Sequence, residues 1–130
     1  MTDRGRVWLV TGASRGLGRA ISEVALEAAE TVVATARRAG TLVGFDDLHG
    51  SRALIAALDV NDRAQTTAVV QSALDAFGRI DVLVDNAGYG LTGGIEEVTE
   101  QQARDQMEVN FFGAQWCTQA VLPTMRRCMK

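Results

Sequence analysis

A glycine-rich segment near the N-terminus, placed between an apolar run and a helical pattern, constrains the fold of this chain more than any other feature. Residues 6–11 are mostly apolar and β-branched, which predicts a buried strand. Residues 11–18, Thr-Gly-Ala-Ser-Arg-Gly-Leu-Gly, complete the turn. Apolar residues then recur at spacings of three and four, which predicts a helix with its buried stripe at Leu17, Ala20 or Ile21, Val24 and Ala28. This order of strand, turn and helix is typical of a phosphate-binding turn, although a glycine-rich loop without a ligand is the alternative.

Each of the three glycines in this turn has its own expected role. Gly12 lets the chain turn sharply off the strand, Gly16 leaves room for a pyrophosphate, and Gly18 lets the helix pack closely on the sheet. Ser14 and Arg15 add a hydroxyl donor and a fixed cation. The only lysine of the chain is Lys130, so a phosphate loop that depends on lysine is excluded.

Strand and helix patterns continue to alternate along the rest of the chain. Strands are predicted at 31–36, 53–58 and 80–84, whereas the polar connection 37–52 has no clear pattern. Asn61 or Asp62 is expected to cap a helix that ends at Gly78. The predicted buried stripe of this helix consists of Thr67, Val70, Leu74 and Phe77.

A last, long helix is predicted from a capping box formed by Thr99 and Gln102. Pro123 should bend or break this helix. Its predicted stripe consists of Met107, Phe111, Ala114, Thr118, Val121 and Met125.

Strands separated by crossover helices pair in parallel, with helices on both faces of the sheet. The chain therefore predicts an α/β fold with a Rossmann-like, doubly wound parallel sheet, truncated to about four strands plus helices. We expect one domain over residues 1–130, incomplete at its C-terminus because another strand would be expected where the sequence stops.

Composition excludes several classes of function. The net charge of -3 argues against a nucleic-acid partner, because phosphate neutralisation needs a basic face. The apolar runs are too short to cross a bilayer and no signal-peptide pattern is present, so we expect no membrane partner and a cytoplasmic location. The single histidine, His49, excludes a two-histidine metal site, and no metal is expected. On one helix, Cys117 and Cys128 would lie roughly 16 Å apart, too far for a disulfide.

Three segments together resemble the short-chain dehydrogenase/reductase family. Thr11, Gly12, Gly16 and Gly18 match its Thr-Gly-x-x-x-Gly-x-Gly turn. Asp59-Val60 follows the third predicted strand, where the family has an aspartate that contacts the adenine amino group. Asn86-Ala87-Gly88 follows the fourth, where the family has Asn-Asn-Ala-Gly, although Asp85 replaces the first asparagine. The resemblance spans the chain but covers only the first half of the family's fold.

The resemblance implies an oxidoreductase that binds a nicotinamide dinucleotide and interconverts alcohols and carbonyls, its substrate being undetermined. The residues expected to bind this cofactor are Gly12, Ser14, Arg15, Gly16, Leu17, Gly18, Asp59, Val60, Asn86, Ala87 and Gly88. Arg37 and Arg38 follow the second predicted strand, where an NAD enzyme usually has an acidic residue. Guanidinium groups can grip a 2′-phosphate, so NADP is favoured over NAD, although two solvated arginines are the alternative.

The family's catalytic set is only partly present. Asn110 matches the helical asparagine whose backbone holds a water of the proton relay. Tyr89 is the only tyrosine, Gly93 stands where the lysine of Tyr-x-x-x-Lys would follow, and no serine occurs after Ser72. We therefore expect the isolated chain to lack catalysis, which leaves open a noncatalytic NADP(H)-binding module or an inactive truncated product. The strand 80–84 would have an unpaired edge, so we also expect marginal stability or association into homo-oligomers.

Overall fold

A computed structural model describes residues 5–129, apart from the side chain of Asp46. The strands are β1 (Val7–Val10), β2 (Thr31–Ala36), β3 (Ala53–Ala57) and β4 (Val82–Val84). The helices are α1 (Gly16–Glu27), α2 (Phe45–His49), α3 (Arg63–Phe77), α4 (Glu100–Met107) and α5 (Ala114–Cys128). A π-helical turn, Glu108–Gly113, joins α4 to α5, and 3-10 turns occur at Ala39–Leu42, Gly50–Arg52 and Ile95–Glu97.

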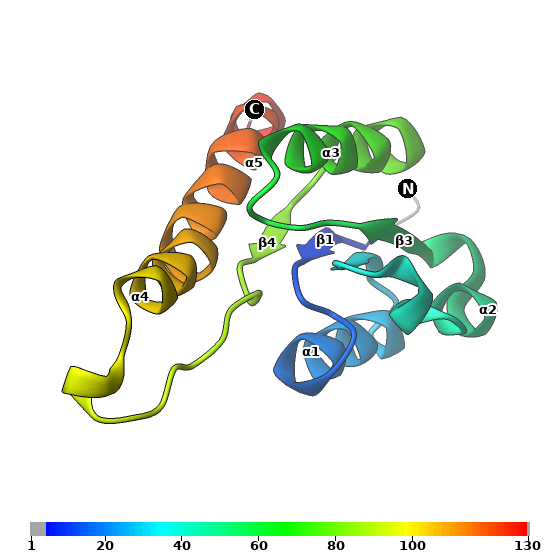
Figure 1. Ribbon diagram of the computed structural model, residues 1–130. Coiled ribbons are helices and arrows are strands. Elements are labelled where there is room, and N and C mark those ends of the chain that lie inside the picture. The colour runs from blue at the N-terminus through cyan, green and yellow to red at the C-terminus, as the bar shows by residue number, and fades with distance from the viewer. Residues whose placement is uncertain (1–4, 130) are drawn as a thin grey trace.

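The four strands form one parallel sheet in the order β3-β2-β1-β4. Figure 1 shows α1 and α2 on one face of this sheet and α3 and α5 on the other. Alternate residues of β1 supply the two cores, with Leu9 packed among the residues of α3 and α5 and Val10 among those of α1. The predicted doubly wound architecture is therefore confirmed, and β4 is an edge strand of the described sheet. The expected association of the chain stays a prediction.

Local signals located the ends of two helices correctly. Asp62 caps α3 by accepting a hydrogen bond from the Gln65 amide, and Gly78 ends that helix in a left-handed conformation with φ of 77°. Thr99 and Gln102 form the predicted capping box at the start of α4. These signals depend only on neighbouring residues, so no tertiary contact was needed to predict them.

The predicted buried stripe of α1 was mostly wrong, because Ile21 is its only member that packs against the core of the described residues. Leu17 and Val24 are 69% and 64% exposed, whereas Gly18, Ser22, Ala25 and Leu26 are buried. The rotation of this helix is set by the close approach of Gly18 to the backbone of the preceding turn, because a Cβ at this position would lie 2.3 Å from the Gly12 carbonyl oxygen. The Ser22 hydroxyl, buried as a result, donates to the Gly18 carbonyl at 2.8 Å.

The predicted stripe of the last helix was also partly wrong. Met107 and Phe111 are about half exposed, and the buried positions are Gly113, Cys117, Val121 and Thr124. The π-helical turn adds a residue to the helical repeat, so the buried face shifts along the sequence. Pro123 does not break α5, because Gln119 and Pro123 both lie on the exposed side, where the carbonyl that loses its helical donor can face water.

The unassigned connection 37–52 contains more structure than its polar sequence suggests. Leu42 and Phe45 are buried in the core beneath α1, and Arg19 of α1 lies over the Phe45 ring at 5.2 Å. The exposed Val43 and Leu48 lie beside these two buried residues in the sequence, so no regular apolar period marks the connection. The side chains of this connection therefore extend the core on the α1 face.

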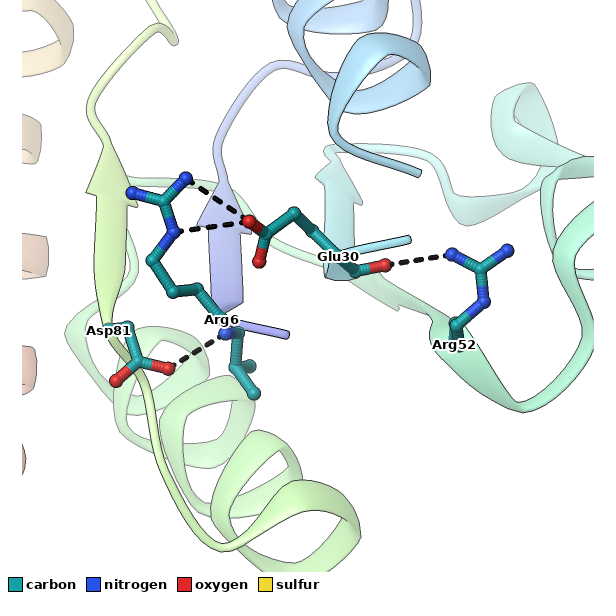
Figure 2. A network of polar contacts seen from close by, with 5 residues as sticks. Arg6, Glu30, Arg52 and Asp81 are labelled. Atoms are coloured by element: carbon teal, nitrogen blue, oxygen red, sulfur yellow. Dashed lines mark hydrogen bonds and ion pairs between the residues drawn. The ribbon is translucent and has the colours of Figure 1, made fainter. Parts of the chain in front are cut away.

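A polar network joins the N-terminal ends of all four strands (Figure 2). Its members are the residues directly before each strand, Arg6, Glu30, Arg52 and Asp81. Arg6 pairs with the Glu30 carboxylate at 3.1 Å, and Arg52 donates to the Glu30 carbonyl at 3.1 Å. Asp81 accepts a hydrogen bond from the Val7 amide at 2.8 Å. The network thus satisfies backbone groups where the strands begin and fixes their relative positions.

Replacing Asp81 tests the contribution of this network to stability. Asp81→Ala leaves the Val7 amide without its acceptor, and we expect a loss of about 1–3 kcal/mol in the free energy of unfolding, measured by urea denaturation. Asp81→Asn keeps an oxygen acceptor and should lose less. Asp75→Ala, on the exposed side of α3, is the matched control and should change stability by no more than about 0.5 kcal/mol. Equal effects of Asp81→Ala and Asp75→Ala would contradict this role.

Candidate functional site

A cleft of about 500 Å³ lies at the C-terminal ends of the strands. Open parallel sheets bind ligands at this edge, near the point where the strand order reverses, and the volume is typical of small-molecule sites. The chain leaves β1 in one direction toward β2 and β3, and β4 lies on the other side of β1. The cleft is lined by Gly12, Ser14, Arg15, Gly16, Leu17, Ala36, Arg37, Leu58, Asp59, Val60, Asn61, Asn86, Ala87, Gly88, Tyr89 and Val109.

Most residues that the sequence predicts as cofactor-binding line this cleft, from four separate segments of the chain. Three of the predicted site residues, Gly18, Arg38 and Asn110, lie outside its lining. The lining residues that sequence reasoning missed are Ala36, Leu58, Asn61 and Val109. No motif marks them, and all four were detectable only as sequence neighbours of predicted site residues. Tyr89, the only tyrosine of the sequence, also lines the cleft.

The glycines of the turn meet different physical requirements. Gly12 and Gly16 have φ of 62° and 61°, a backbone conformation that residues with a Cβ rarely adopt. No other group lies within 4 Å of the Cβ position at Gly16, so this side of the turn is open to the cleft. Gly18 instead allows α1 to pack closely against the loop that follows β4, since a Cβ there would lie 2.4 Å from the side-chain amide nitrogen of Asn86.

Thr11 and Asn86 lock the end of β1 to the loop that follows β4. The Thr11 hydroxyl oxygen accepts hydrogen bonds from the backbone amides of Asn86 and Ala87 at 3.0 and 2.9 Å. The Asn86 side chain donates to the carbonyls of Thr11 and Gly12 at 3.1 and 3.0 Å. These bonds hold the glycine turn against the Asn86-Ala87-Gly88 segment, and both segments line the cleft.

Asn110 holds the same loop from the π-helical turn. Its side-chain oxygen accepts from the Tyr89 amide at 3.0 Å, and its side-chain nitrogen donates to the Tyr89 carbonyl at 2.7 Å. A Cβ at Gly88 would lie 2.9 Å from this side-chain oxygen, so glycine is needed for the approach. The Asn110 side chain is thus occupied by the loop backbone rather than directed into the cleft.

The charged residues around the cleft differ in position. Arg15 and Arg37 are exposed and line the cleft, whereas Arg38 is exposed but lies outside its lining. Asp59 also lines the cleft, and its carboxylate accepts a hydrogen bond from the Asn61 amide at 3.0 Å. The cleft therefore carries one guanidinium group in the turn after β1, a second directly after β2, and a carboxylate after β3.

Asp85, directly after β4, faces α5. The Thr118 hydroxyl donates to its carboxylate at 2.8 Å. Partial burial against α5 raises the pKa of the Asp85 carboxyl, and this hydrogen bond opposes the rise. Burial also raises the pKa of the nearby Cys117 thiol to about 11, with the negative charge of Asp85 adding to the effect. Cys117 and Cys128 are both free thiols, as expected.

Comparison with known proteins identifies the family. The family model for short chain dehydrogenases matches residues 6–130. The chain belongs to the short-chain dehydrogenase family. It is 41% identical over 123 residues to the oxidoreductase BOA17 of Botryotinia fuckeliana, covering 94% of this chain and 45% of that protein. It is 35% identical over 127 residues to the 3-oxoacyl-[acyl-carrier-protein] reductase FabG of Vibrio cholerae, covering 98% and 52%.

The solved structures agree with this assignment. The crystal structure of a short-chain dehydrogenase from Streptomyces avermitilis superposes with a TM-score of 0.92 and 44% sequence identity, covering 98% of this chain and 47% of that one. The Rossmann-like fold is therefore confirmed. The chain spans about half the length of the curated relatives it matches, and it corresponds to the N-terminal portion of the short-chain dehydrogenase fold.

Within residues 5–129, no helix is long and apolar enough to cross a membrane. In the same part of the chain, no group of three or more histidine, cysteine, aspartate or glutamate side chains is arranged to hold a metal ion.

The raised pKa of Asp85 leads to a test with a definite sign. A carboxyl whose pKa is raised by folding stabilises the fold fully below its ordinary pKa, about 3.9, and this contribution is lost as the pH rises through the folded value. Asp85→Asn keeps an oxygen for Thr118 and removes the charge. We therefore expect it to raise the thermal unfolding midpoint at pH 7, with a gain that shrinks as the pH falls toward about 4. Asp75→Asn is the exposed control, and a pH-independent effect of Asp85→Asn would contradict the mechanism.

Proposed function

We propose that this chain binds NADP(H) in the cleft and forms the cofactor-binding part of a short-chain oxidoreductase that interconverts alcohols and carbonyls. The observation that carries the proposal is the glycine turn at a strand-to-helix junction, locked by Thr11 and Asn86 against the loop that follows β4. The residues present fit a dinucleotide. Gly16 leaves the turn open where a side chain would enter the cleft, and α1 begins there with free amide groups and the positive end of its dipole.

The residues proposed to hold the cofactor come from each part of the cleft lining. The 12–18 turn would bind the pyrophosphate through its amides, with Ser14 adding a hydroxyl and Arg15 a positive charge, and Leu17 would pack against the ligand. Asp59 and Val60 would lie against the adenine, and Asn86, Ala87 and Gly88 would line the remainder. Gly18 contributes indirectly, because it allows the turn to close on Asn86. A bound nicotinamide would supply or accept the hydride of the reaction.

Arg37 is the residue we propose for selecting NADP over NAD. No carboxylate stands at the end of β2, where it would bind the 2′-hydroxyl of NAD and repel a 2′-phosphate. Arg37 occupies this place in the cleft and offers a guanidinium group, and Arg15 faces the same cleft from the turn. Arg38 is expected to contribute less, because it lies outside the lining.

We propose that Asn110 contributes to the catalytic site through its backbone. Its side chain is bound to Tyr89, so the side chain positions the loop beside the cleft. The π-helical turn around Asn110 interrupts the regular α-helical hydrogen bonding, and a backbone carbonyl released by this change would hold the water molecule. This arrangement supports a role in a proton relay.

A second candidate function is a noncatalytic NADP(H)-binding module. The residues of this chain include one tyrosine, Tyr89, with glycine at position 93, and no serine after Ser72. A tyrosine with an ordinary pKa of about 10 is a poor acid at neutral pH unless a cation lowers it. Binding without turnover is the behaviour that this observation favours.

Calorimetry with the purified chain tests cofactor binding and its selectivity. We expect saturable binding of NADPH that is tighter than that of NADH. Arg37→Ala should weaken NADPH binding by about tenfold and leave NADH binding nearly unchanged, because a charged hydrogen bond is lost. Arg38→Ala is the matched control with a smaller effect. Absence of saturable binding to either dinucleotide contradicts the proposed function, whereas equal losses in the two variants contradict only the assignment to Arg37.

Turnover separates the two candidate functions. NADPH oxidation by the purified chain is followed at its absorbance maximum over a panel of ketones, aldehydes and acyl carbonyls. We expect binding without carbonyl-dependent oxidation for these 130 residues, because no positioned acid is among them. Turnover above the buffer rate would instead support catalysis by this chain and identify its substrate class.

A further inference from the structure

The turn that carries Asp59 is held by a residue outside the cleft, Gln65 of α3. The Asp59 amide donates to the Gln65 side-chain oxygen at 2.6 Å. No strand among the described residues offers this amide an acceptor, because β3 is at the edge of the described sheet. The neighbouring Leu58 amide, by contrast, is satisfied by the Ala36 carbonyl of β2 at 2.9 Å. Gln65 therefore supplies the bond that the sheet cannot.

The arrangement departs from an ordinary helix cap. Asp62 is the N-cap of α3 and Gln65 lies three residues later, where a capping-box glutamine would return to the Asp62 amide. Here the Asp62 amide donates to the Asp59 carbonyl at 2.9 Å, and the Gln65 side chain reaches past it to Asp59. The Gln65 amide in turn donates to the Asp62 carboxylate at 3.1 Å. The start of α3 is thus built around the backbone of a residue that lines the cleft.

The same turn is supported from its other side. A Cβ at Gly113 would lie 2.5 Å from a methyl carbon of Val60, so the π-helical turn is in close contact with this buried side chain. Within the Asp59 carboxylate, one oxygen accepts from the Asn61 amide at 3.0 Å. No described residue donates to the second oxygen, which leaves it to a donor in the cleft.

We propose that Gln65 is a positioning residue for adenine recognition, holding the Asp59 backbone so that the free carboxylate oxygen meets the adenine amino group. This inference rests on the proposed function, in which Asp59 lies against the adenine. Gln65 does not line the cleft, so it acts through Asp59. Replacing Gln65 should therefore weaken the binding of a dinucleotide only when its base carries the amino group. A purely structural role of Gln65 at the start of α3 would not produce this dependence.

Calorimetry with two dinucleotides that differ only in the base tests the proposal. NADPH carries the adenine amino group, and reduced nicotinamide hypoxanthine dinucleotide phosphate lacks this donor. For the unaltered chain we expect NADPH to bind more tightly than the hypoxanthine dinucleotide by about tenfold. Gln65→Leu should reduce this ratio by about threefold or more, mainly by weakening NADPH binding. Gln65→Glu keeps an oxygen acceptor and should retain most of the ratio.

The controls separate positioning from stability. Gln71→Leu replaces a glutamine on the exposed side of the same helix and should leave both affinities unchanged. If Gln65→Leu does not fold, the same measurement is made with Gln65→Met, because the unbranched methionine side chain is similar in length to glutamine. If these variants weaken the binding of both dinucleotides equally, or change only the unfolding midpoint, Gln65 has a structural role at the start of α3 and no role in adenine recognition.

Failure of this inference is distinguishable from failure of the proposed function. If the unaltered chain binds both dinucleotides equally well, Asp59 does not recognise the amino group and the role of Gln65 is overturned, while NADP(H) binding stands. If neither dinucleotide binds, the proposed function itself fails, and the role of Gln65 fails with it.

Discussion

The reciprocal hydrogen bonds between Thr11 and Asn86 are the interaction on which the rest of the site depends. They join the end of β1 to the loop after β4, two segments separated by more than 70 residues of sequence. Because Asn86 also donates to the Gly12 carbonyl, the path of the glycine turn is set by the same side chain. Gly18 must then lack a Cβ, since its backbone packs against Gly12 and Asn86 together. The orientation of α1 follows from that contact.

The two ends of the sheet have different roles. At the N-terminal ends of the strands, charged side chains bind to one another and to backbone groups, so their bonding capacity is largely used within the chain (Figure 2). At the C-terminal ends, the loops leave the amides of a glycine turn, two guanidinium groups and a carboxylate facing an open cleft. One end therefore stabilises the arrangement of the strands, and the other is left for a ligand.

Two side chains on the α3 face, those of Gln65 and Asn110, support the site without lining the cleft. Gln65 holds the Asp59 turn, and Asn110 holds the Tyr89 loop. Both use side-chain amides on loop backbone, which lies at strand ends where no sheet partner exists. Family membership suggests a nicotinamide dinucleotide in the cleft, and these two contacts indicate how the chain would keep its loops in place for one.

The elements whose signals are local were predictable from the sequence. The four strands, the caps at Asp62 and Thr99 and the end of α3 at Gly78 follow from patterns within a few residues. The exposed stripe of α1 was mistaken for its core face, because hydrophobic spacing carries no information about a glycine that must touch the next turn. The shifted face of α5 was missed because nothing in residues 108–113 marks a π-helical turn.

What the sequence by itself determined is the class of fold and the family, since the order of strands, helices and glycine spacing is a property of neighbouring residues. What only the tertiary structure decided is which side chains meet. Thr11 is hydrogen-bonded to Asn86, and Gln65 is hydrogen-bonded to Asp59. Arg37 lines the cleft, whereas Arg38 does not. Such pairings depend on strand order, helix rotation and the geometry of turns, which are set by packing across the whole sheet and not by any short stretch of chain.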